Sequence, residues 1–87
     1  MKLIIAILRD VDADPVTRAL TAGNFRITRI ASTGGLLHRG VTTIFVGMED
    51  EKVEEVIQIL KQTCCDAPEG EKRATVFVVP VEKFERL

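Results

Sequence analysis

Four short stretches rich in aliphatic and β-branched residues flank two helical patterns, in an order that few folds accommodate. The apolar stretches cover residues 2–8, 25–33, 41–48 and 74–79, and the helical patterns cover residues 14–22 and 50–62. Strand, helix, strand, strand, helix, strand is the order of the split βαβ arrangement. It predicts an α+β fold in which a four-stranded antiparallel sheet carries two helices on one face.

The two helices are indicated by different signals. Asp14 followed by Pro15 is typical of a helix start, because the carboxylate accepts a bond from an unpaired N–H and proline has no N–H to leave unpaired. Gly23 is expected to end this helix. The second helix is expected to begin with Asp50 as its cap. Its apolar positions, spaced along one helical face, are Val53, Val56, Ile57 and Leu60.

The strands read as apolar on both faces, most clearly in the last one, Ala74–Val79. Two helices cover only one face of the sheet, so the other face must contact something else, and the simplest candidate is another copy of the chain. A chain of 87 residues buries only about 60–65% of its unfolded surface, which leaves its stability alone marginal. We therefore expect residues 1–87 to form a single domain that assembles into an oligomer.

Charge and hydropathy exclude several classes of protein. The 12 Lys and Arg residues are balanced by 13 Asp and Glu residues, so the chain lacks the basic excess that binding to a nucleic acid polymer or an anionic membrane requires. No apolar run approaches the roughly 18 residues of a membrane span. The apolar run after Met1 is interrupted at Arg9-Asp10 and is too short for a signal peptide. We therefore expect a cytoplasmic protein.

The cysteines and the histidine do not indicate a disulfide or a metal site. Cys64 and Cys65 are adjacent, and neighbouring Cα atoms lie about 3.8 Å apart, below the usual disulfide range. Together with His38 they fall short of the four spaced ligands of structural zinc. Free, partly buried thiols are the expectation, and a metal site is the alternative.

A catalytic centre is not predicted. Ser32 is the only serine and lacks the Gly-x-Ser-x-Gly context of a nucleophile elbow. His38 is expected to be a solvated loop residue rather than a general base. The acidic runs 49–51 and 54–55 fit a helix N-terminus and a solvated helix face better than paired catalytic carboxylates.

The segment 33–40 is the most informative loop, because three of its eight residues are glycine. Glycines at 34 and 35 allow backbone N–H groups to face an anion or a ligand to approach the main chain closely. The loop lacks the Lys-Ser/Thr of a Walker A sequence, which excludes a P-loop. A plain connection between two strands is the alternative reading.

Polar residues alternate along the strand that enters this loop. Arg26 and Thr28 share one face and Asn24 precedes them, so an amide, a guanidinium and a hydroxyl are available to a base and a phosphate. Leu36 and Leu37 at the loop tip could flank a flat, adenine-like ring. Alternatively, Arg26 pairs with an acidic helix and the leucines pack against a neighbouring subunit.

These segments resemble the cyclic-di-AMP receptor family of PII-like signalling proteins. The resemblance covers nearly the whole chain and has no gap through Gly47. It is carried by Asn24-Phe25-Arg26-x-Thr28, by Thr33-Gly34-Gly35-Leu36-Leu37, by Gly40, Thr42-Thr43 and Gly47, and by the segments 1–7 and 74–81.

The resemblance implies a ferredoxin-like βαββαβ protomer, a homotrimer, and one dinucleotide at each subunit interface. It further implies that Asn24, Arg26 and Thr28 contact the adenine or the phosphates of cyclic di-AMP. Gly35, Leu36 and Leu37 are then expected to line the pocket, and Gly47 to leave room beside it. No cofactor is implied, and the downstream protein partner is unknown.

Two departures from the family pattern are visible. The family commonly has a long, glycine-rich insertion before the last strand, whereas residues 64–73 form a short connection here, and Val41 stands where the family commonly has Asn. Three functions remain as hypotheses. The first is a non-enzymatic signalling protein that binds cyclic di-AMP or another adenine nucleotide. The second is a trimeric interaction or structural protein that has lost nucleotide binding. The third is a small enzyme that depends on His38 or Ser32.

Overall fold

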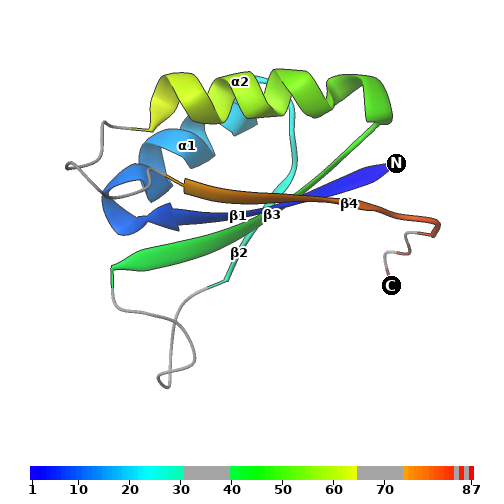
Figure 1. Ribbon diagram of the computed structural model, residues 1–87, viewed down its shortest axis with the longest axis horizontal. Coiled ribbons are helices and arrows are strands. Elements are labelled where there is room, and N and C mark those ends of the chain that lie inside the picture. The colour runs from blue at the N-terminus through cyan, green and yellow to red at the C-terminus, as the bar shows by residue number, and fades with distance from the viewer. Residues whose placement is uncertain (31–39, 65–73, 84, 86) are drawn as a thin grey trace.

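The computed structural model describes residues 1–30, 40–64, 74–83, 85 and 87. Its elements follow the predicted order (Figure 1). They are β1 (Lys2–Arg9), α1 (Asp10–Ala22), β2 (Ile27–Ile30), β3 (Val41–Met48), the 3-10 turn η1 (Asp50–Lys52), α2 (Val53–Thr63) and β4 (Ala74–Pro80). The strands form one antiparallel sheet in the order β2-β3-β1-β4, with both helices on the same side. The predicted α+β, ferredoxin-like βαββαβ sandwich is confirmed.

The start of α1 differs from the prediction by four residues. The helix begins at Asp10 rather than at Asp14, and Pro15 lies inside it, where proline removes one backbone hydrogen bond. The reason is tertiary. The backbone N–H of Asp10 donates to the carbonyl of Gly40 at 2.7 Å, and the hydroxyl of Thr42 donates to the Asp10 carboxylate. These contacts from the start of β3 outweigh the local helix-start signal.

Two other element boundaries also differ. Asp50 does not cap α2 but opens η1, and its carboxylate lies 3.1 Å from the ammonium group of Met1. The second strand is limited to Ile27–Ile30 among the described residues, because the N–H of Phe25 still bonds back to the carbonyl of Leu20 at the end of α1. Residues 31–33, which were also predicted to be strand, lie outside the described part of the chain.

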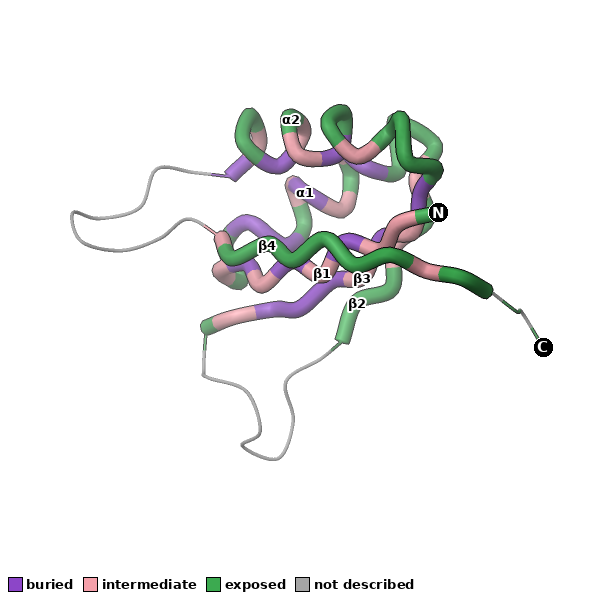
Figure 2. The backbone as a smooth tube through the Cα atoms, turned by 45° about the vertical axis from the view of Figure 1, so that its right-hand side comes forward, coloured by how far each residue is buried: buried purple, intermediate pink, exposed green. Residues whose placement is uncertain are grey.

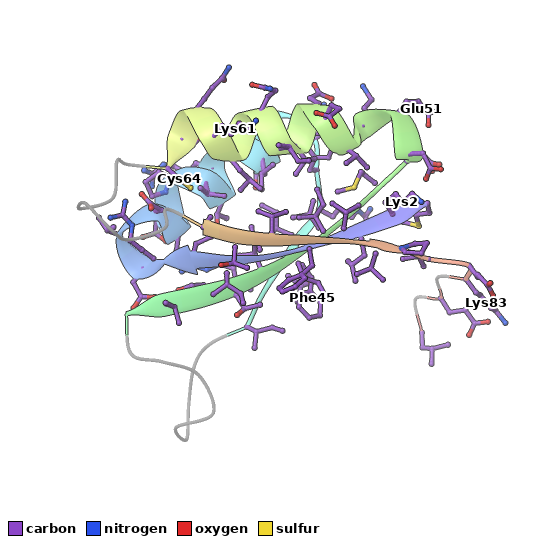
Figure 3. The ribbon with its side chains drawn as sticks, in the orientation of Figure 1. Lys2, Phe45, Glu51, Lys61, Cys64 and Lys83 are labelled. Carbon is purple, nitrogen blue, oxygen red and sulfur yellow. The ribbon has the colours of Figure 1, made fainter. Side chains whose placement is uncertain are left out.

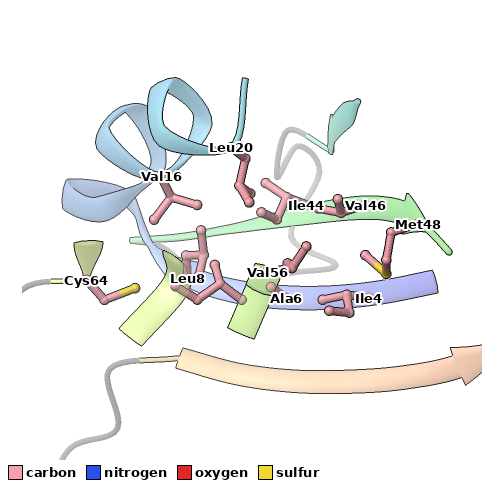
Figure 4. Close-up of a cluster of buried hydrophobic side chains, with 11 residues drawn as sticks. Ile4, Ala6, Leu8, Val16, Leu20, Ile44, Val46, Met48, Val56 and Cys64 are labelled. Carbon is pink, nitrogen blue, oxygen red and sulfur yellow. The ribbon is translucent and has the colours of Figure 1, made fainter. Parts of the chain in front are cut away.

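The hydrophobic core lies between the helices and one face of the sheet (Figure 4). Every second residue of β1 is buried there, from Ile4 to Leu8, and so is every second residue of β3 from Ile44 to Met48, because successive side chains of a strand point to opposite faces. The side chains that are fully buried there are Ile4, Ala6, Leu8, Val16, Leu20, Ile44, Val46 and Val56. Leu60 is also buried, whereas Val53 and Ile57 are only partly covered. At the edge of the core, the side chain of Cys64 is buried, in line with the burial expected for this cysteine; Cys65 lies outside the described residues.

The other face of the sheet has no helix over it and is also apolar. Ile5 stands opposite both Phe45 and Phe77 in the strand register, so these three side chains share this face, and Phe45 points away from the helices (Figure 3). Phe77 is 53% exposed and Val79 is 38% exposed, and β4 is exposed along most of its length (Figure 2). We call this surface, formed by Leu3, Ile5, Ile7, Phe45, Phe77 and Val79, the open face.

Candidate functional site

A cavity of about 840 Å³ opens at one end of the sheet, a size typical of small-molecule sites. It lies where the turn after α1, the first residues of β1, the end of β3 and η1 converge. Its walls are Met1, Lys2, Leu3, Gly23, Asn24, Phe25, Arg26, Thr28, Phe45, Gly47, Met48, Glu49, Lys52 and Val81. Four predicted site residues, Asn24, Arg26, Thr28 and Gly47, are therefore brought together. Gly35, Leu36 and Leu37 lie outside the described residues, as do His38 and Ser32.

Asn24 occupies this wall because of how α1 ends. Gly23 ends the helix, and Asn24 adopts the left-handed backbone conformation with φ of +68°. The N–H of Phe25 donates to the carbonyl of Leu20, and the N–H of Asn24 donates to that of Thr21, both at 3.0 Å. This pair of bonds is the Schellman motif, in which Asn is one of the few residues accepted besides glycine. The backbone of Asn24 thus closes the helix, while its side chain is exposed at the cavity.

The two roles of Asn24 can be separated by substitution. We expect Asn24→Ala to lower the free energy of unfolding by about 1 kcal/mol, because a left-handed backbone is unfavourable for alanine. Asn24→Gly removes the same amide but accepts this backbone, so its stability should stay within about 0.5 kcal/mol of the parent. Urea denaturation of both variants measures this difference. Equal losses in the two variants would contradict a structural role for the left-handed turn. If the expected difference is found, Asn24→Gly is the variant to use in ligand-binding measurements, because it removes the amide and keeps the fold stable.

Arg26 reaches the cavity without an ion-pair partner among the described residues. The alternative reading, in which Arg26 pairs with an acidic helix, does not describe this structure. The arginine that does so is Arg29, whose Nη1 lies 2.8 Å from Oδ1 of Asp14 on α1. Arg26 and Thr28 alternate with the partly buried Phe25 and Ile27, which confirms the predicted alternation. The guanidinium of Arg26 remains available to an anion.

Gly47 has a neighbour that the sequence does not reveal. A Cβ atom at this position would lie 3.2 Å from the Cε atom of Met1, so the glycine permits the Met1 side chain to lie close to β3. The Met1 carbonyl is held in turn by the N–H of Val81 at 3.0 Å. The room beside Gly47 is therefore partly used by Met1.

Several wall residues escaped the sequence analysis. Lys2, Lys52 and Phe45 line the cavity, and Lys2 lies at the same end of the sheet as η1 (Figure 3). Lys52 lies within the acidic stretch 49–55. The net negative charge of this stretch does not suggest a site for an anion. Phe45 looks in the sequence like any other strand residue. Only the folded sheet places these side chains beside Arg26.

The charge of the cavity wall is positive. Lys2, Arg26 and Lys52 contribute three cations and Glu49 one carboxylate, which leaves a net charge of two positive. Asp50 is nearby, but its negative charge is paired with the ammonium group of Met1. A hydrogen bond from the Met1 ammonium, with a smaller contribution from Lys2, holds the pKa of the Asp50 carboxyl below its usual range. A wall of this charge suits an anionic ligand.

Other kinds of site find less support in the part of the chain that the structure describes. No group of three or more His, Cys, Asp or Glu residues there could hold a metal ion. No described helix is both long and apolar enough to cross a membrane. A second cavity, of about 450 Å³, lies between α2 and β4 and is mainly apolar, and it contains none of the predicted site residues.

The fold and the chain's resemblances define a PII-like protein. The chain belongs to the cyclic-di-AMP receptor family, whose model matches residues 1–69. It is also similar to a solved structure, that of a functionally unknown protein from Pediococcus pentosaceus. The two share 38% sequence identity and a TM-score of 0.80, over 99% of this chain and 96% of that one. The resemblance inferred from the motifs is confirmed.

The comparisons also bear on the short connection before β4. The family match ends at residue 69, between α2 and β4.

Proposed function

We propose that the protein is a non-enzymatic, PII-like signalling protein that binds cyclic di-AMP, or another adenine nucleotide, at the subunit interfaces of a homotrimer. The observation that carries this proposal is the cavity in which Asn24, Arg26, Thr28 and Gly47 converge. Its wall has a net charge of two positive, and cyclic di-AMP carries two phosphodiester anions. Membership of the cyclic-di-AMP receptor family supports the same ligand.

Each wall residue has a chemical role in this proposal. The Asn24 amide pairs with the edge of an adenine, Arg26 contacts a phosphate, and the Thr28 hydroxyl bonds to either group. We expect Gly35, Leu36 and Leu37, which lie outside the described residues, to line the pocket as the family resemblance implies. Because no bond is made or broken, the protein acts by changing the surface that a downstream protein partner recognises.

The open face supports assembly of like chains. Its exposed valine and phenylalanine side chains are the kind of surface that proteins cover in an interface.

A trimeric interaction protein without a ligand is the second candidate, and Val41 and the short connection favour it. A thermal-shift and calorimetric titration with cyclic di-AMP, ATP and AMP distinguishes the two, with cyclic di-GMP as a base control. We expect cyclic di-AMP to raise the melting temperature, since a ligand at 100 times its Kd adds about 2.7 kcal/mol to stability. If no adenine nucleotide raises it, the receptor function is wrong and the interaction protein is supported.

A further inference from the structure

Lys52 lies at the rim of the cavity, on the turn that leads into α2. It lines the cavity wall, yet its Nζ atom pairs with Oε2 of Glu55 on the first turn of α2 at 3.4 Å. The backbone N–H of Lys52 donates to the carbonyl of Glu49 at 2.9 Å, which holds η1 in place. Lys52 therefore has access to two anions, Glu55 on the helix and any anion within the cavity.

The pair between Lys52 and Glu55 is weak enough to be exchanged. The side chain of Lys52 is 57% exposed and that of Glu55 is 50% exposed. Ion pairs between exposed side chains contribute little to stability. A phosphate within the partly enclosed cavity forms stronger, charge-assisted hydrogen bonds with an ammonium group. Because Lys2 and Arg26 line the same cavity, a phosphate drawn there by these cations lies within reach of the lysine at the rim.

We propose that Lys52 is an additional anion-binding residue of this cavity. When the nucleotide binds, the Lys52 ammonium group gives up its ion pair with Glu55 and contacts a phosphate of the nucleotide instead. The inference rests on the proposed receptor function and extends it. Release of Glu55 changes the electrostatics at the start of α2, since η1 runs directly into this helix through Val53. Occupancy of the cavity is thereby transmitted to the outer surface of the helix layer.

A double-mutant cycle with cyclic di-AMP tests this exchange. We expect Lys52→Gln to raise the Kd about fivefold and Glu55→Gln to lower it about twofold, because the competing carboxylate is gone. In the Lys52→Gln background, Glu55→Gln should have no larger effect than Glu54→Gln. Glu54→Gln is the matched control: it removes a neighbouring charge that forms no ion pair with Lys52, and its effect should be smaller and equal in both backgrounds. Lys52→Arg should retain most of the affinity.

A structural readout accompanies the calorimetry. Cyclic di-AMP should change amide hydrogen exchange in the first turn of α2 in the parent protein and not in Lys52→Gln. If Glu55→Gln acts equally in both backgrounds, or Lys52→Gln binds like the parent while Arg26→Ala does not, the exchange is wrong and the receptor function stands. If the parent protein binds no adenine nucleotide, both are overturned.

Discussion

Arg26→Ala is expected to weaken the binding of cyclic di-AMP at least about tenfold, or about 1.4 kcal/mol. Arg26 is the cation of the cavity wall that lies between Asn24 and Thr28, and no described residue forms an ion pair with it. Its guanidinium can therefore be committed to a phosphate, with two parallel hydrogen bonds that a lysine cannot reproduce. Isothermal titration calorimetry of the variant measures the loss directly.

Arg29→Ala is the matched control for this experiment. It removes the same kind of side chain three residues further along the chain, but Arg29 reaches the helix side of the sheet and pairs with Asp14. We expect its Kd to stay within about twofold of the parent, with a stability loss of at most about 1 kcal/mol. Arg26→Lys should give an intermediate affinity. Parent-like binding by Arg26→Ala would show that the site assignment is wrong, and an equal loss in Arg29→Ala would indicate only a general charge effect.

The order of the elements was predictable because the patterns that specify it are local. Val56 and Leu60 fall on one face of a helix whatever surrounds them, and both are buried as predicted. The start of α1 was not predictable in the same way. It depends on bonds from Gly40 and Thr42 to Asp10, which only the folded sheet brings together, and the local Asp14-Pro15 signal points elsewhere.

The same distinction applies to the candidate site. Arg26 and Thr28 could be recognised because period-two alternation places them on one face before any tertiary contact is known. Lys2 and Lys52 come from distant segments of the sequence, and nothing local links them to Arg26. Asn24 combines both cases: its position after Gly23 suggests a helix end, but its left-handed backbone becomes evident only in the structure. Gly35, Leu36 and Leu37 remain predictions.

Phe77→Glu is expected to convert the proposed homotrimer into monomers at micromolar concentration. Phe77 lies on the open face opposite Ile5 and is 53% exposed in the single chain. If sister chains cover this face, each trimer would have to bury three unpaired carboxylates, at a cost of several kcal/mol per ion. Sedimentation velocity should report one third of the parent mass. Because the proposed nucleotide site lies between subunits, the variant should also lose affinity for cyclic di-AMP.

Val11→Glu controls for the introduction of a charge at an exposed apolar position. Val11 is 65% exposed and lies at the start of α1, on the helix side of the molecule, where a negative charge is favourable. This variant should sediment like the parent. Circular dichroism should show both variants folded, since the Phe77 side chain contributes little to the core of one chain. A Phe77→Glu variant that retains the parent mass, or a parent protein that sediments as a monomer, would contradict an interface on the open face and with it the placement of the ligand between subunits.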